Sequence, residues 1–176
     1  MGISVLKEGS RKGMSTSEEL RVVTTRKLTS FEQQALGYTK AQDDVRRYGM
    51  IHSALEEVYE KYRPVCMGIE SYSVFENKGN NAWKTTMVYG GVIFWALSKR
   101  MQIFPFFPMD LRREFFLGKS GTKNDVQRMV SKLIPNFEKL ISGIAKGKQE
   151  HAADATGYAL MAMRRCKIGD ARHAFI

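Results

Sequence analysis

The feature that most constrains the fold is an alanine-rich stretch that begins at Lys148, close to the C-terminus. Small side chains let a helix lie close against a sheet, and the alanines that would do so here are Ala152, Ala153, Ala155, Ala159 and Ala162. His151 and Asp154 stand three residues apart at the start of this helix, so they share one face of it. The pattern predicts a closely packed helix that holds two polar, metal-capable side chains over a strand.

The strand that best complements this helix covers residues 65–70, an apolar run that ends in Glu70. Ligands of α/β proteins bind at the carboxyl ends of strands, so Glu70 is a candidate site residue. Two alternatives stay open. Glu70 can be a surface residue that merely ends a strand, and polar residues such as His151 and Asp154 are favoured at helix starts without any function.

The remaining pattern predicts an α/β domain. Short β-branched or apolar segments at residues 3–6, 14–17 and 20–28, with a turn at Glu18 and Glu19, suggest an antiparallel meander. Periodic apolar residues and prolines predict helices over residues 41–62, 82–100 and 125–134, with shorter pieces at 111–116 and 137–144, and a buried strand over 101–107. Strands followed by alternating helices and strands predict a mixed sheet. The length predicts one domain over residues 1–176, with a basic tail from residue 166.

A formal net charge of +10 on 176 residues predicts a polyanionic partner, most simply nucleic acid. The alternative is a basic protein without such a partner. The two cysteines lack metal-binding spacing, and the charged first dozen residues offer no signal-peptide core, so we expect a reduced, cytoplasmic protein, an organelle being a further option. The longest apolar run, around residues 87–97, is too short to span a bilayer.

Three motifs occur in an order that resembles a known family. They are Met67-Gly68-Ile69-Glu70, the glycine-rich basic loop of residues 118–126, and the segment of residues 150–155 that holds His151 and Asp154. With them the chain resembles the RuvC-type Holliday junction resolvases of the RNase H-like superfamily, clearly over residues 60–166 and weakly over the N-terminal meander. The resemblance implies an RNase H-like fold with a mixed five-stranded sheet flanked by helices, and a homodimer with the helix from Ala82 at its interface.

The resemblance also implies a metal-dependent endonuclease that cuts four-way or branched DNA. Family members hold two divalent ions with four acidic or histidine ligands, and by motif match Glu70, His151 and Asp154 would be three of them. Carboxylate oxygens suit Mg²⁺, and one imidazole among them suits Mn²⁺ equally. Paired ions activate a water and stabilise the leaving oxygen during phosphodiester hydrolysis.

The fourth ligand is absent from its expected place. The family carries an Asp at the end of its first strand, and in this chain that position falls on Leu6 or Lys7, with Glu8 one residue out of phase and therefore on the other face. Three interpretations stay open. Glu8 replaces the Asp through a local bulge; the true first strand is absent or altered in this chain; or the protein binds junctions and cuts poorly, with the Lys7 ammonium partly replacing the charge of a metal.

Basic and aromatic side chains near these motifs are expected to contact DNA. The lysine and arginine positions would bind phosphates, and the aromatic ones would stack on an unpaired base. These residues are Tyr72, Phe75, Lys78, Arg113, Lys119 and Lys123. A solvated basic loop and a core role for Phe75 are the alternatives. Two rival functions also stay open, namely a non-catalytic protein that binds branched DNA with the same fold and a less selective flap or fork nuclease.

Overall fold

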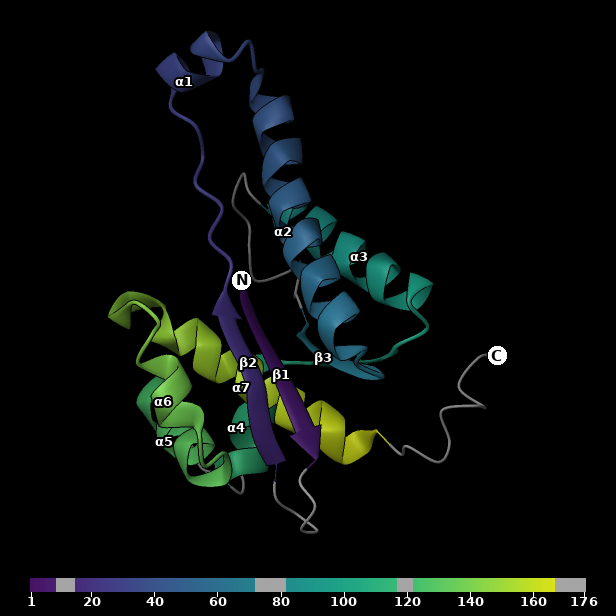
Figure 1. Ribbon diagram of the computed structural model, residues 1–176, viewed down its shortest axis with the longest axis vertical. Helices are drawn as coiled ribbons and strands as arrows, with labels where there is room; N and C mark the ends of the chain where they lie inside the picture. Colours follow the sequence, from purple (N-terminus) through teal and green to yellow (C-terminus); the bar gives the residue numbers. More distant parts are fainter. Residues whose placement is uncertain (9–14, 72–81, 117–121, 167–176) are drawn as a thin grey trace. The chain divides into compact units, whose positions relative to one another are not determined.

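The computed structural model describes residues 1–8, 15–71, 82–116 and 122–166 (Figure 1). The elements are β1 (Gly2–Glu8), β2 (Ser15–Val22), α1 (Ser30–Ala35), α2 (Lys40–Tyr62), β3 (Cys66–Glu70), α3 (Ala82–Ser98), β4 (Gln102–Phe106), α4 (Pro108–Phe116), α5 (Lys123–Leu133), α6 (Phe137–Ile141), a 3₁₀ turn (Lys146–Lys148) and α7 (Gln149–Arg165). They divide into two compact units, one of Met1 with residues 23–63 and one of residues 2–22 and 64–176. The single domain expected over residues 1–176 stays a prediction.

The first unit consists of an extended segment followed by α1 and α2, and α2 confirms the amphipathic helix expected over residues 41–62. Thr29 and Thr39 each begin a helix as the N-cap of a capping box. Asp43, which is only 1% exposed, accepts hydrogen bonds from the backbone N–H of Leu28 and from the Arg46 guanidinium. A buried carboxylate therefore fastens the extended segment to the first turn of α2.

In the second unit, the N-terminal strands differ from the expected meander. The two strands expected at residues 14–17 and 20–28 are one strand, β2, which ends at Val22, and the pair Glu18 and Glu19 is not a turn. The ladder with β1 instead shifts register there, because Val5 faces Glu19 whereas Leu6 faces Ser17. The extra residue is absorbed as a bulge, which the sequence cannot distinguish from a turn at two adjacent acids.

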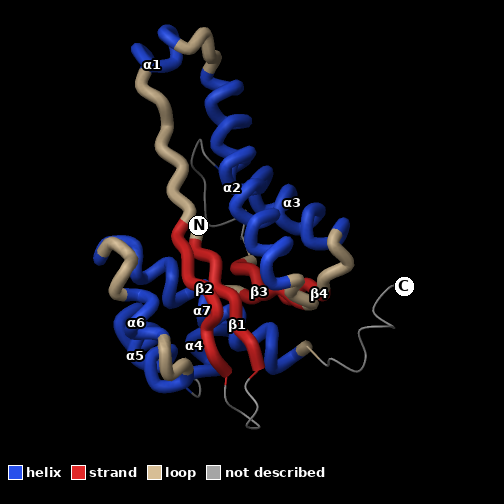
Figure 2. The backbone as a smooth tube through the Cα atoms, viewed as in Figure 1, coloured by secondary structure: helices blue, strands red, loops and turns tan. Residues whose placement is uncertain are grey.

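The described strands form two separate pairs, so the expected mixed five-stranded sheet is not confirmed. β1 and β2 are antiparallel, whereas β3 and β4 are parallel and place Glu70 opposite Phe106 at the end of the ladder. The parallel pair is connected through α3, as parallel strands require a long crossover. In Figure 2 the strands of both pairs are drawn in red, and α7 lies beside them.

Both strand pairs pack on the alanine-rich helix α7, which confirms the close packing that the alanines predict. A Cβ on Gly2 would lie 2.2 Å from the carbonyl oxygen of His151, and a Cβ on Gly68 would lie 2.2 Å from that of Tyr158. Only glycine permits so close an approach of strand and helix backbones. The Thr156 hydroxyl adds a hydrogen bond of 3.0 Å to Ser4 Oγ.

The strands β1 and β3, one from each pair, run along α7 in opposite directions. β1 begins beside His151, and Ser15, the ladder partner of Glu8, places its hydroxyl 3.8 Å from the sulfur of Met163. β3 begins at Cys66, whose thiol lies beside that of Cys166 at the end of α7. The Glu70 end of β3 therefore lies toward the N-terminal half of α7, and the Glu8 end of β1 lies toward its C-terminal half.

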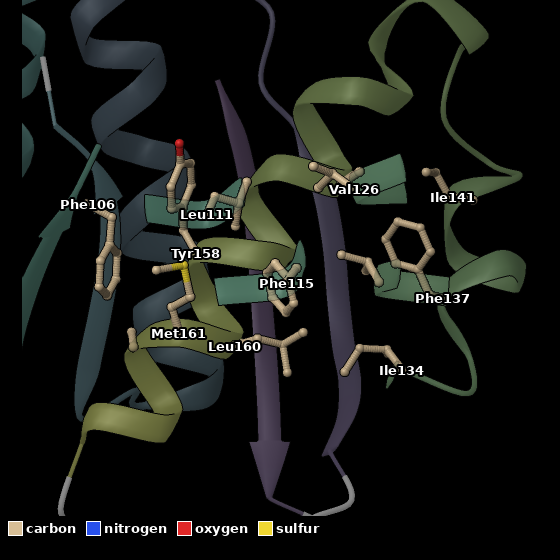
Figure 3. Close-up of a cluster of buried hydrophobic side chains, with 13 residues drawn as sticks. Phe106, Leu111, Phe115, Val126, Ile134, Phe137, Ile141, Tyr158, Leu160 and Met161 are labelled. Atoms are coloured by element: carbon tan, nitrogen blue, oxygen red, sulfur yellow. The ribbon is translucent and has the colours of Figure 1, made fainter. Parts of the chain in front are cut away.

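The core lies between α7, β4 and helices α4, α5 and α6 (Figure 3). Its largest fully buried apolar side chains are Phe106, Ile134, Phe137, Val130 and Met161. The rings of Phe106 and Tyr158 stack at a centroid distance of 6.2 Å and an interplanar angle of 6°. No helix in the described part of the chain is long and apolar enough to cross a membrane.

Candidate functional site

The candidate site is built where the end of β3 meets the first half of α7. Gly68 faces α7 at Tyr158, and Glu70, two residues later, lies on the same face of the strand. Asp154 stands four residues before Tyr158, so the two share a face of α7. The strand register directs Glu70 toward α7 near Tyr158, and the helix period places Asp154 on the same face of α7 as Tyr158. The two carboxylates are therefore expected on the same side of α7.

The environment of the Tyr158 hydroxyl agrees with this convergence. Burial raises the pKa of this phenol well above its usual range, and the charges of Glu70, Asp154 and Asp110 raise it further. Carboxylates act in this way only from nearby, because their effect is screened with distance. In Figure 3 the Tyr158 oxygen points away from the apolar side chains that surround the ring.

Asp110 is a third carboxylate at this place, and the sequence reasoning missed it. It lies in the first turn of α4, where its Oδ2 accepts a hydrogen bond of 2.8 Å from the backbone N–H of Phe107. The next residue, Leu111, packs against Gly157 of α7, which holds this turn beside Tyr158. Two signals could have found the site: Asp110 follows closely on the end of a parallel strand, and Tyr158 stands one turn after Asp154.

His151 lies on the first turn of α7 and is exposed, whereas Asp154 is half-buried and Glu70 is exposed. Within residues 1–8, 15–71, 82–116 and 122–166, no three histidine, cysteine or acidic side chains stand close enough to hold a metal ion as they are oriented. The donor chemistry nevertheless suits a divalent cation, because β3, α4 and α7 each contribute a carboxylate whose charge acts on Tyr158, and carboxylate oxygens are the ligands such ions prefer. Ligation would require a rotamer change, which the exposed Glu70 side chain can make.

Glu8 and Lys7 are placed away from this site. Glu8 pairs with Ser15 at the level of Met163 on α7, twelve residues beyond His151, which corresponds to about 18 Å along a helix. Lys7 is exposed on the same end of β1. The structure therefore gives no support to the interpretation that Glu8 replaces the fourth ligand or that Lys7 occupies the metal position.

Only part of the expected DNA-contacting set lies in the described residues. Arg113 is exposed in the last turn of α4, and Lys123 is the first residue of α5, directly after its N-cap Thr122. The other expected contacts, Tyr72, Phe75, Lys78 and Lys119, lie outside the described residues. All six stay predictions.

The fold and the site together define an α/β protein with acidic groups at the end of a parallel strand pair. Among solved structures, two of Thermus thermophilus RuvC match with a TM-score of 0.67, one alone (22% identity) and one "in complex with Holliday junction substrate" (20% identity). Each match covers 96% of this chain, and 89% and 88% of the respective Thermus chains. At this level of identity the likeness concerns the fold.

The family itself is shown by sequence. The sequence model of the family described as "Crossover junction endodeoxyribonuclease RuvC" matches residues 11–162. The chain therefore belongs to the RuvC family of crossover junction endodeoxyribonucleases, a family of divalent-metal-dependent nucleases, and the resemblance found in its motifs is confirmed. A comparison with curated proteins finds no match.

Proposed function

We propose that this chain is a Holliday junction resolvase whose active site lies where the acidic end of β3 meets the first half of α7. It acts as a homodimer on four-way DNA junctions in the cytoplasm of a bacterium or a phage-infected host, and each protomer nicks one strand to leave a 5′ phosphate. The observation that carries the proposal is the close packing of β3 on α7 at Gly68, which directs the strand end at Glu70 toward the half of α7 that holds His151 and Asp154.

In this proposal Glu70, His151 and Asp154 hold Mg²⁺ or Mn²⁺, two ions per active site. The bound ions supply an activated water and stabilise the leaving oxygen of the phosphodiester. The chain supplies the geometry: β3 presents Glu70 from a strand end that packs on α7, and α7 presents Asp154 and His151 from one rigid helix. Rigid elements hold a site more accurately than loops do.

Contacts to DNA would come from the basic and aromatic residues that the sequence motifs single out. The exposed Arg113 and the helix start at Lys123 would bind phosphates together with Lys119 and Lys78, while Tyr72 and Phe75 would stack on bases at the crossover. The net charge of +10 supports this partner, and it predicts that junction affinity falls steeply with salt concentration.

The exposed face of α3 supports the dimer. Trp83, Met87, Phe94 and Leu97 are 54%, 54%, 76% and 48% exposed, and their spacing of four, seven and three residues places them on one side of the helix. Val92, Trp95 and Ala96 are buried on the opposite side. A two-fold dimer formed through the exposed face would present two active sites to a junction of matching symmetry.

The test is a substrate panel with the purified protein. A synthetic four-way junction, a flap, a fork and a linear duplex of the same sequence are incubated with Mg²⁺, with Mn²⁺ and with a chelator, and both binding and nicking are measured. We expect paired nicks in the junction that depend on the metal. Tight junction binding without nicks in either metal would favour a non-catalytic binding protein, and equal cutting of flaps or forks would favour a less selective nuclease.

A further inference from the structure

The connection between β4 and α4 exposes an aromatic side chain. Phe106, the last residue of β4, is fully buried among the core side chains that Figure 3 shows. Phe107 is the one residue between β4 and α4, and it is 54% exposed. Met109, in the first turn of α4, is 59% exposed. An aromatic ring and a thioether thus stand two residues apart on the surface, where they add nothing to the core.

The backbone of Phe107 is fixed on both sides. Its N–H donates a hydrogen bond of 2.8 Å to Asp110 Oδ2, and its carbonyl oxygen accepts one of 2.9 Å from the Asp110 N–H. The next residue is Pro108, whose ring restricts the backbone at the start of the helix. The ring of Phe107 is therefore presented from a rigid position, and a rigid aromatic side chain loses little conformational entropy when it binds a partner.

Local stability does not explain a phenylalanine at this place. Three other helices of the chain begin after a threonine, Thr29, Thr39 or Thr122, whose side chain accepts a hydrogen bond from the first helical turn. Phe107 stands at the equivalent position before α4 and has no polar atom that could do so. A serine or threonine would stabilise the helix start. The exposed ring is thus kept where a polar residue would suit the fold better.

The position of Phe107 relative to the strands connects it with the candidate site. The ladder of β3 and β4 places Glu70 opposite Phe106, and the Ser71 N–H donates a hydrogen bond of 2.6 Å to the Phe106 carbonyl oxygen. The chain therefore leaves β4 for Phe107 at the strand end that carries Glu70. A ligand that reaches Glu70 from this end of the ladder passes the exposed ring.

The exposed side of α4 adds positive charge to this apolar surface. Met109, Arg112 and Arg113 are three and four residues apart, so they share one face of the helix, and all three are exposed. Neither arginine forms an ion pair with an acid in the part of the chain that the structure describes. An aromatic ring followed by available guanidinium groups suits a nucleic acid strand, because the ring stacks on bases and the cations bind phosphates.

We infer that Phe107 is a DNA-binding residue of the active-site face: its ring stacks on a base that the four-way junction leaves unpaired or distorted at the crossover, while Arg112 and Arg113 bind phosphates of the same strand. The inference rests on the proposed function for its substrate. It adds a stacking position on α4 to the contacts expected from the sequence motifs.

The experiment measures the affinity of the full-length chain for a synthetic four-way junction by fluorescence anisotropy, in a chelator so that no strand is cut. The variants are Phe107→Ser, Phe107→Trp and Phe31→Ser. Phe31, on α1 in the other compact unit, is the matched control because it is an aromatic residue with 79% exposure. We expect Phe107→Ser to weaken binding about 5–150-fold, the effect of losing one base–aromatic stack. Phe107→Trp and Phe31→Ser should bind as the wild type does.

Two further readouts separate stacking from a general disturbance of the surface. Phe107→Ser should leave the salt dependence of binding unchanged, because a ring releases no counterions, whereas Arg113→Gln should reduce the slope by about 1. Junctions that lack one base at a time around the crossover complete a double-mutant cycle. At the position that the ring contacts, the missing base should weaken wild-type binding, and Phe107→Ser should then cause no additional loss.

The outcomes distinguish this inference from the proposed function. If the wild type binds and nicks junctions but Phe107→Ser binds equally well, the ring has no role in binding and only the inference falls. A loss that is the same with every abasic junction, or a change of oligomeric state in light scattering, would also overturn it, the latter by assigning Phe107 to a protein interface. If the wild type binds the junction no better than a linear duplex, the proposed function fails and the inference fails with it.

Discussion

The two halves of the helix α7 differ in their roles: the first holds candidate site residues, and the second anchors the helix in the core. The first half carries His151 and Asp154, and the Glu70 end of β3 lies toward it. The second half is anchored, since Leu160, Met161 and Ala162 are buried, and its C-cap residue Cys166 lies beside Cys66 at the start of β3.

The comparison shows how a small α/β domain can hold polar groups accurately. The anchored half of α7 and the glycine contacts of β1 and β3 fix the helix, and the first half buries Ala152, Ala153 and Thr156 while His151 stays exposed and Asp154 half-buried. Function and stability should therefore separate along the helix, and the following variants test this separation.

The largest effect is expected from a change in the first half. Asp154→Asn should reduce metal-dependent junction cleavage by more than the roughly 10–100-fold that loss of an outer partner costs, because a neutral amide is a far weaker ligand for Mg²⁺ or Mn²⁺ than a carboxylate. Junction affinity in a chelator should stay close to that of the wild type. Nicking rates and electrophoretic binding assays measure the two quantities.

The matched variant at the other end of the helix is Glu8→Gln. The backbone of Glu8 lies at the level of Met163, so we expect cleavage at the wild-type rate. If Glu8→Gln reduces the cleavage rate as much as Asp154→Asn does, Glu8 is a metal ligand after all, and β1 lies elsewhere along α7.

The next effect concerns the anchored half. Met161→Ala removes a side chain with no exposed surface and should destabilise the fold by about 2–5 kcal/mol, through lost burial and the cavity that remains. Urea denaturation measures the free energy of unfolding. Below the transition, the Mn²⁺ affinity of the folded fraction should stay near the wild-type value; a selective loss of Mn²⁺ binding would show that the two halves are not separable.

The smallest effect compares two glycines in this unit. Gly68→Ala should cost about 1–3 kcal/mol, because the new Cβ would lie 2.2 Å from the Tyr158 carbonyl oxygen and backbone must move. Gly91→Ala in α3 meets nothing within 4 Å and should stabilise the protein by up to about 1 kcal/mol through helix propensity. Thermal melts of the two variants should therefore shift in opposite directions; equal shifts would argue against the close packing of β3 on α7.

The parts of the fold that the sequence predicts are those encoded by local period. The alanine-rich face of α7 and the apolar face of α2 follow from helical spacing, and Glu70 at a strand end follows from an apolar run that stops at an acid. The sequence predicts a turn at Glu18 and Glu19 where the structure has a bulge, because two adjacent acids look the same in a turn and in an irregular strand. The spacing of residues along one strand does not show where its register with the partner strand shifts.

The parts of the site that the sequence does not predict depend on contacts between distant elements. Asp110 becomes relevant only because Leu111 packs on Gly157, and the Tyr158 hydroxyl only because its ring is buried against Phe106. Glu8 was a candidate because the alignment of motifs places it near a ligand position. The direction of β1 along α7, which moves it away, is a property of the packed structure.

The central claim is that Glu70 and Asp154 share one cation pocket beside Tyr158. Crystals of the full chain soaked in Mn²⁺ test it most directly, through the anomalous signal of the metal. The account predicts a peak within about 2.0–2.6 Å of carboxylate oxygens of both residues, the range of oxygen–cation distances for such ions. A fully occupied Mn²⁺ bound elsewhere, with Glu70 and Asp154 making no contact to it, would contradict the account.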